Sequence, residues 1–179
     1  MSKIDSDREF LPVNIAIATI SDTRTLENDK SGNLLEKMIT ESGHTIVERR
    51  IVKDDKEAIV EMLRGWIADK KVDAVITTGG TGLTGRDTTP EAFKDVIEKE
   101  IEGFGELFRW LSYSKIGTST IQSRALGGLA HGTYLFALPG SPGACKDGWK
   151  DILEAQFDAR HRPCNLVELM PRLLEHLPG

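Results

Sequence analysis

The sequence is poor in cysteine and in long apolar runs, and each shortage excludes a class of protein. Cys145 and Cys164 are the only cysteines in 179 residues and form no CxxC pair, so a disulfide framework is not expected. The longest apolar runs, such as Tyr134 to Leu138, are far shorter than the roughly 20 residues of a membrane span. No basic-then-apolar signal peptide opens the chain. We therefore expect a cytoplasmic protein with reduced thiols and no membrane partner.

Positive charge is also scarce, with 23 Lys and Arg against 28 Asp and Glu and a net charge of -5. Nonspecific polyanion binders carry an excess of basic residues, so nucleic acid is not an expected partner. The four histidines show no ligand spacing, which argues against a zinc site. Hydrophobic residues make up 39% of the chain, enough for the core of one domain at this length. We expect a flexible N-terminal segment at residues 1–10 and a single domain over 11–179.

Short β-branched runs alternate with helical stripes along the chain. This alternation predicts right-handed βαβ crossovers and a three-layer α/β/α fold with a mainly parallel sheet covered on both faces. A polar start, Asp54 with Glu57, is typical of a capping box for the second helix. Strands are predicted at 13–20, 45–52, 72–78 and 133–138. Helices are predicted around 34–39, 59–67, 93–97, 104–111, 149–157 and 166–177, the last kinked or restarted at Pro171.

Four predicted strands end in polar or glycine-rich segments. Such sheets bind ligands at the carboxyl ends of their strands, so these segments are expected to meet in one crevice. They are Ser21 with Asp22, Asp54, the loop 79–87, and the loop 139–143.

The loop 79–87 contains Gly80, Gly82 and Gly85 in a G-x-G-x-x-G pattern, which allows a dinucleotide-binding interpretation. That fingerprint needs a helix to open within the glycines, whereas here the helix start is expected only at Thr89 and Pro90. We favour a loop whose uncovered backbone amides cradle an anion such as phosphate. A tight turn is the simpler alternative.

Charged side chains accompany this loop. Asp87 is suited either to hold Mg²⁺ beside a phosphate or to cap the following helix. Ser119, Ser123 and Arg124 offer hydroxyls and a guanidinium fork suited to phosphate, or form a solvated helix face. The rigid loop 139–143 exposes amides before a helix, and could also be a plain strand-to-helix turn.

Two separate motifs together resemble the MoaB/Mog family of molybdenum cofactor biosynthesis. They are Thr77-Thr78-Gly79-Gly80-Thr81-Gly82 with Arg86-Asp87-Thr88-Thr89-Pro90-Glu91-Ala92, and Pro139-Gly140-Ser141-Pro142-Gly143-Ala144. Residues 108–112, 116–119, 123–125 and 162–165 are similar to the MoaB branch.

The resemblance implies a molybdopterin-binding fold and, in active members, adenylylation of molybdopterin by Mg-ATP with release of pyrophosphate. The family's two acidic positions map onto Asp54 and Asp87, which would act in catalysis and hold Mg²⁺. A molybdopterin-binding paralogue without this activity remains an alternative, and a Rossmann-like NAD(P)-binding protein is a more distant one. The remaining residues expected to bind molybdopterin and ATP are Ser21, Asp22, Thr78, Gly79, Gly80, Thr81, Gly82, Ser119, Ser123, Arg124, Pro139, Gly140 and Ser141.

Apolar side chains on more than one side of the helix around 104–111 predict self-association. At 100° per residue, Trp110 lies about 200° around the helix from Phe108, and a neighbouring subunit would bury the second side. The family resemblance implies the number of subunits, a trimer or a dimer of trimers. Other molybdenum cofactor enzymes are further candidate partners.

Overall fold

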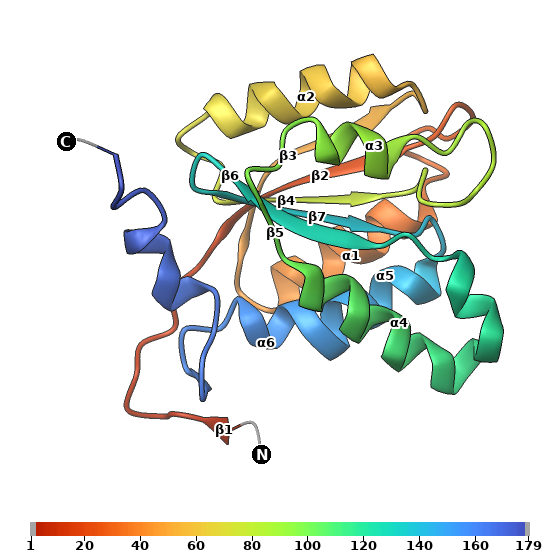
Figure 1. Ribbon diagram of the computed structural model, residues 1–179. Helices are drawn as coiled ribbons and strands as arrows, with labels where there is room; N and C mark the ends of the chain where they lie inside the picture. Colours follow the sequence, from red (N-terminus) through yellow and green to blue (C-terminus); the bar gives the residue numbers. More distant parts are fainter. Residues whose placement is uncertain (1–2, 178–179) are drawn as a thin grey trace.

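The computed structural model describes residues 3–177 and contains a six-stranded sheet between two layers of helices (Figure 1). The strand order is β3-β2-β4-β7-β6-β5, in which β3, β2, β4 and β7 are parallel. β6 is antiparallel to both of its neighbours. The three-layer, mainly parallel fold predicted from the sequence is confirmed. The strands are β2 (Asn14–Ile20), β3 (Thr45–Val52), β4 (Ala74–Thr78), β5 (Lys99–Glu100), β6 (Leu126–Ala130) and β7 (Thr133–Leu138).

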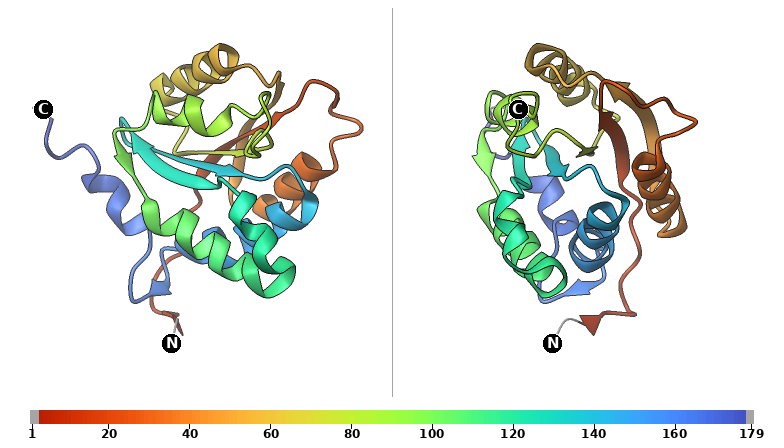
Figure 2. Two further views of the ribbon diagram at one scale, coloured as in Figure 1. Left: turned by 45° about the vertical axis from the view of Figure 1, so that its right-hand side comes forward. Right: turned by 90° about the vertical axis from the view of Figure 1, so that its right-hand side faces the viewer.

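The helices divide between the two faces of the sheet (Figures 1 and 2). One face carries α2 (Lys56–Ala68) and α3 (Thr89–Lys94). The opposite face carries α1 (Lys30–Glu41), α4 (Glu102–Ile116), α5 (Pro142–Gly148), the π-helical turn η2 (Trp149–Leu153) and α6 (Glu154–Gln156). The 3₁₀ helix η1 (Gly117–Gln122) continues α4 and leads toward β6.

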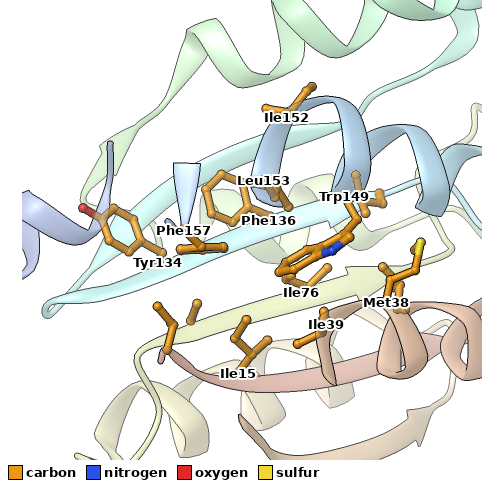
Figure 3. Packing of buried hydrophobic residues seen from close by; sticks show 14 of the residues in the cluster. Ile15, Met38, Ile39, Ile76, Tyr134, Phe136, Trp149, Ile152, Leu153 and Phe157 are labelled. Atoms are coloured by element: carbon orange, nitrogen blue, oxygen red, sulfur yellow. The ribbon is translucent and has the colours of Figure 1, made fainter. Parts of the chain in front are cut away.

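Each face of the sheet has its own hydrophobic core because successive side chains of β2 point to opposite sides. Ile15 and Ile17 pack with Trp149 in one cluster, whereas Ala16 and Ala18 belong to the other. Figure 3 shows the first cluster, where aromatic rings from β7, η2 and the segment after α6 meet aliphatic side chains of β2, β4 and α1. Burial on both sides explains why β2 reads as a continuous apolar run.

Two elements of the sheet were not predicted from the sequence. β6 contains Gly127 and Gly128, and glycine has low β-propensity, so the segment lacks the pattern of a strand. β5 has only two residues. Both nevertheless belong to the sheet, because β6 pairs with β7 along its whole length and β5 pairs with β6.

The predicted helix over 166–177 is wrong. The chain forms instead a short 3₁₀ helix, η3 (Val167–Arg172), followed by turns to residue 177. Pro171 lies inside η3, and proline lacks the N–H that an α-helix needs while its ring crowds the preceding turn.

The start of the described chain, predicted as a flexible segment, lies against the C-terminal part. β1 (Lys3–Ile4) pairs with β8 (His161–Arg162) in a separate two-stranded sheet. Arg8 forms an ion pair with Glu168. The division at residue 11 stays a prediction.

No helix within residues 3–177 combines the length and hydropathy needed to cross a membrane. The cytoplasmic location stays a prediction.

Candidate functional site

The four parallel strands end at one edge of the sheet, and the segments that follow them contact one another. Ser21 N donates to Val52 O at 2.8 Å, and Gly79 N donates to Leu138 O at 3.0 Å. Thr78 Oγ1 donates to Pro139 O at 2.9 Å. The predicted convergence of polar strand ends is therefore what the structure shows.

The glycine loop passes close beneath the end of β2. Gly79 has a φ of +106°, and a Cβ there would lie 2.3 Å from the carbonyl oxygen of Ile20, so no other residue fits. Thr89 closes the loop from the other end, because its N–H donates to Gly80 O and its Oγ1 donates to Gly79 O. Within residues 3–177 no backbone carbonyl accepts a hydrogen bond from the amides of Gly80 or Thr81. These amides remain available to an anion.

A cavity of about 790 Å³ opens between the glycine loop, the loop after β7 and the C-terminal half of α4. Its size is in the range of small-molecule sites. Ten of the predicted site residues line it besides Asp87: Ser21, Thr78, Gly79, Gly80, Thr81, Gly82, Ser123, Pro139, Gly140 and Ser141.

Asp54 lies against the glycine loop rather than on a helix end. The capping prediction for this residue is wrong by one position, because the N-cap of α2 is Asp55, whose carboxylate accepts from Ala58 N at 2.9 Å. A Cβ on Gly80 would lie 3.0 Å from Asp54 Oδ1, which places this carboxylate directly beside the loop. Burial, with smaller contributions from the charges of Asp87 and Asp22, raises the pKa of Asp54.

Asp87 is fixed by its own loop. Its Oδ2 accepts hydrogen bonds from Thr84 N at 2.8 Å and Thr84 Oγ1 at 2.6 Å, and no side chain caps the first turn of α3. The carboxylate packs on Gly82, where a Cβ would lie 2.7 Å from Oδ2. Burial opposes ionisation of Asp87, but these hydrogen bonds outweigh it and lower the pKa. The alternative role of Asp87 as a helix cap is excluded.

Arg124 braces the glycine loop through hydrogen bonds to its backbone. Its Nε donates to Gly82 O and its Nη2 donates to Asp87 O, both at 2.8 Å, while Nη1 pairs with Glu91. Arg124 does not line the cavity. Its guanidinium therefore holds the backbone at Gly82 and at Asp87, and its nitrogens already donate to acceptors within the protein.

Asp54, Asp22 and Ser119 also lie outside the cavity lining. Asp22 pairs with Arg86, and this hydrogen bond lowers the pKa of Asp22. Its Oδ1 also accepts from Asp54 N at 3.2 Å, so it orients the segment that carries Asp54. Ser119 is exposed on η1. Ser141 reaches the cavity but also caps α5, because its Oγ accepts from Ala144 N at 3.1 Å.

Several lining residues were missed in the sequence. Arg24 comes from the loop between β2 and α1, and Phe108, Ser112 and Lys115 come from α4. The spacing of 108, 112 and 115 is that of one helix face, which was a usable signal. Nothing in the sequence placed this face over the glycine loop, because the packing of α4 depends on β6.

The carboxylates fit a magnesium ion that arrives with a phosphorylated substrate. Among residues 3–177 no three His, Cys, Asp or Glu side chains form a cluster that could hold a metal alone. Mg²⁺ commonly binds through one or two carboxylates with substrate phosphates and waters completing its shell. Asp54 and Asp87, on two sides of a loop with free amides, supply a donor set of this kind.

The geometry does not support the dinucleotide-binding alternative. The glycine loop follows β4 rather than the first strand of the sheet, and α3 begins at Thr89, beyond the last glycine of the pattern at Gly85.

A family model described as "Probable molybdopterin binding domain" matches residues 16–159. Molybdenum cofactor biosynthesis protein B of Escherichia coli (strain K12) is 48% identical over 165 residues, which cover 92% of this chain and 96% of that protein. The protein of the same name from Staphylococcus epidermidis is 48% identical over 150 residues, or 82% of this chain and 85% of that protein.

Solved structures agree with these sequence matches. A crystal structure of molybdenum cofactor biosynthesis protein B superposes with a TM-score of 0.85 and 41% identity, covering 94% of this chain and 99% of the other. The tungsten cofactor synthesizing protein MoaB from Pyrococcus furiosus gives a TM-score of 0.68 and 32% identity, covering 92% and 96%.

Proposed function

The chain belongs to the molybdopterin-binding-domain family of molybdenum cofactor biosynthesis proteins, and from this premise we propose that it binds molybdopterin and adenylylates it with Mg-ATP. The family supports a role in cofactor biosynthesis and the binding of molybdopterin. The transfer of AMP is the finer step, and the side chains around the glycine loop support it.

The observation that carries the proposal is the position of two carboxylates at a loop with free backbone amides. Asp54 lies beside Gly80 and Asp87 beside Gly82, so an anion bound by the amides of Gly80 and Thr81 would have both carboxylates nearby. Negative groups repel one another at such short range unless a cation lies between them. Two carboxylates would repel a phosphate bound alone, whereas a magnesium-bound phosphate is commonly held through one or two carboxylates.

In the proposed reaction an oxygen of the terminal phosphate of molybdopterin attacks the α-phosphorus of ATP. A bond forms between that oxygen and the α-phosphorus, and the bond from the α-phosphorus to the bridging oxygen of the β-phosphate breaks. Adenylyl-molybdopterin and pyrophosphate are the products. Bound Mg²⁺ would neutralise charge on the phosphates during the transfer.

The residues of this chain act mainly by positioning, which suits phosphoryl-transfer chemistry. Asp87 is ionised and held by Thr84, so it offers a fixed carboxylate to the metal. Asp54 is held on the other side of the loop, where Asp22 accepts a hydrogen bond from its amide. The amides of Gly80 and Thr81 orient a phosphate between them.

The cavity has room for more than a triphosphate. Beyond the loops it is walled by Phe108, Ile116 and Ala144, an apolar surface suited to a flat ring. We assign the whole cavity to the two substrates together, without dividing it between pterin and nucleobase. We also propose self-association as a trimer or a dimer of trimers and, as further partners, other enzymes of molybdenum cofactor synthesis.

The direct test is to incubate the purified protein with molybdopterin, ATP and Mg²⁺ and to identify the pterin product by mass spectrometry. The expected product carries one AMP on the pterin phosphate, and its formation requires Mg²⁺. Binding of both substrates with no AMP-bearing pterin would favour a molybdopterin-binding protein without transferase activity. Binding of NAD in their place would revive the dinucleotide alternative.

A further inference from the structure

The cavity has little free positive charge for substrates that carry several phosphates. Among residues 3–177 only four charged side chains line it, the acidic Asp87 and Asp147 and the basic Arg24 and Lys115. Lys115 is already paired, because its Nζ lies 2.6 Å from Asp147 Oδ1 and 3.2 Å from Asp151 Oδ2. Two carboxylates on one ammonium group leave it little attraction for an anion.

Arg24 differs from Lys115 in how it is held. Its nearest acid is Asp29, at 3.6 Å between Nη1 and Oδ1, which is longer than a hydrogen bond. Within the described chain no side-chain hydrogen bond from the Arg24 guanidinium is formed. The side chain is 34% exposed and faces the cavity. A guanidinium has five N–H donors in a fork that matches phosphate oxygens, so these donors are available to a ligand.

Asp29 is satisfied without Arg24. The carboxylate is fully buried and accepts from Thr19 Oγ1 at 2.5 Å, Gly32 N at 3.0 Å and Arg49 Nη2 at 2.9 Å. Arg49, which also pairs with Glu36, is the closer of its two arginines and takes the hydrogen-bonding position on the carboxylate. The attraction of Asp29 orients Arg24 without occupying its donors.

The backbone of the loop that carries Arg24 is fixed as well. Ser21 Oγ, directly after β2, accepts hydrogen bonds from Thr23 N and Arg24 N, both at 3.2 Å. Asp29 then caps the first turn of α1 through Gly32 N. The loop is thus tied at both ends, and an ordered loop keeps the guanidinium at the cavity wall at a lower entropic cost.

We propose that Arg24 binds phosphoryl oxygens of a substrate in this cavity, with Asp29 as its positioning residue. The inference rests on the proposed function for the identity of the phosphate compounds, ATP and molybdopterin. Either phosphate presents the same chemistry to the guanidinium. Arg24, in the loop after β2, would supply the free positive charge that the cavity otherwise lacks.

The test measures binding, so it does not depend on turnover. Equilibrium dissociation constants are measured in Mg²⁺ for α,β-methylene-ATP, which cannot undergo the transfer, and separately for molybdopterin. We compare the wild-type protein with Arg24→Gln and Arg24→Lys. Arg64→Gln is the matched control, because it removes one positive charge from the exposed surface of α2, outside the cavity lining.

In Arg24→Gln we expect one of the two dissociation constants to rise about tenfold to a hundredfold, the range for losing hydrogen bonds to a charged group. Arg24→Lys should recover part of the loss, because lysine keeps the charge but not the fork. Arg64→Gln should change neither constant. The ligand whose affinity falls identifies whether the nucleotide or the pterin phosphate is bound.

Both dissociation constants within twofold of wild type in Arg24→Gln, with an unchanged unfolding midpoint, would overturn the proposal. The same is true if the wild-type protein binds neither ligand. If the wild-type protein binds both ligands but transfers no AMP, the proposed adenylylation fails while a weakened Arg24→Gln still supports the phosphate contact.

Discussion

At the scale of single residues, the two carboxylates at the glycine loop differ in their readiness to ionise. Thr84 donates two hydrogen bonds to Asp87 and stabilises its charged form, which lowers its pKa despite partial burial. The pKa of Asp54 is raised by burial and, to a smaller extent, by the charges of Asp87 and Asp22. Asp87 is therefore the more readily ionised of the two carboxyls, and Asp54 is the less readily ionised.

Replacing Asp87 with Asn should reduce AMP transfer by about a hundredfold or more, the scale of removing one group that stabilises charge in a transition state. Asn keeps an acceptor for Thr84, so the loop should stay folded. Transfer rates at saturating substrates and Mg²⁺ test this, with circular dichroism as the fold control. Full activity would remove Asp87 from the metal site.

Replacing Asp54 with Asn should weaken Mg²⁺ activation and slightly stabilise the protein. A carboxyl whose pKa is raised on folding contributes stability below its unfolded pKa and loses it as the pH rises. At neutral pH the charged Asp54 is therefore unfavourable, and its removal should add about a few tenths of a kcal/mol after solvent screening. Urea unfolding with and without Mg²⁺ checks both effects. Unchanged Mg²⁺ dependence of transfer would contradict the metal role.

The pH dependence of Mg²⁺ binding by the wild-type protein should also depend on Asp54. At the proposed metal site, protonation of Asp54 would remove a ligand, and its raised pKa would shift this loss toward less acidic pH than an ordinary carboxyl shows. The apparent Mg²⁺ affinity should fall as the pH drops toward that pKa. A constant affinity down to pH 4 would contradict an ionised Asp54 at the metal.

At the scale of elements, the main strands and their order along the chain followed from the sequence. β7 begins and ends where its apolar run predicts it, because strands buried on both faces are apolar throughout. β3 also matches its predicted range, although it lies at the edge of the sheet and carries Glu48, Arg49 and Arg50. β6 could not be predicted, since Gly127 and Gly128 give it no pattern of its own and only pairing with β7 makes it a strand. The C-terminal leucine spacing suggested a helix that Pro171 prevents.

Only part of the candidate site could likewise be predicted from the sequence. The glycine loop and Asp87 were identified because several glycines after a strand, followed by an acid, are typical of an anion-binding loop. Arg24 and the α4 face are ordinary residues whose role depends on which elements meet, so the sequence could not single them out. Arg124 was predicted as a phosphate ligand, and the structure shows its fork bound to the loop backbone.

Breaking the Arg124 brace should loosen the loop between its two contacts. In Arg124→Gln we expect faster hydrogen exchange over residues 82–88, with little change in the sheet, because local opening follows the loss of local contacts. Arg64→Gln on α2 is again the control. Equal protection of the loop in Arg124→Gln and wild type would show that Arg124 is not a brace.

A buried histidine joins the start of β2 to the turn after α1. His44 Nδ1 accepts from Val13 N at 3.1 Å, and the ring packs edge-on against Trp149. Burial lowers the pKa of His44, although the charges of Asp158 and Glu154 oppose this. A lowered pKa in the folded state means that stability is complete above the ordinary value of 6.5 and declines as the pH falls below it.

Unfolding free energies of the wild type and His44→Gln measured between pH 8 and 5 isolate this effect. Gln offers an acceptor for Val13 N without titrating in that range. The wild type should lose more stability on acidification than the variant does. Parallel pH dependence of the two proteins would show that His44 does not contribute.

At the scale of the whole molecule, one surface remains apolar and exposed. Trp110, Tyr113 and Ile116 on α4 and Ile121 on η1 are 71%, 59%, 54% and 77% exposed. Apolar groups gathered on one side of a molecule are typical of contact surfaces. Ile116 also lines the cavity, so a subunit on this face would approach the site.

Light scattering should give a mass of three or six times 19.8 kDa. Trp110→Glu should shift this mass toward 19.8 kDa, because a charge would be buried in the interface. Arg64→Gln on α2, on the other face of the sheet, changes one charge away from these apolar residues and serves as control. A single species at 19.8 kDa for the wild type would contradict self-association.

The most direct measurement of the proposed function follows the α- and γ-phosphorus atoms of ATP through the reaction. The protein is incubated with molybdopterin, Mg²⁺ and ATP labelled at either the α- or the γ-phosphorus, and the pterin and pyrophosphate fractions are counted. The α-label should appear in the pterin and the γ-label in pyrophosphate, in equal amounts, and both should fall about a hundredfold or more in Asp87→Asn. An unlabelled pterin, or γ-label on the pterin, would contradict an adenylyltransferase built on Asp54 and Asp87.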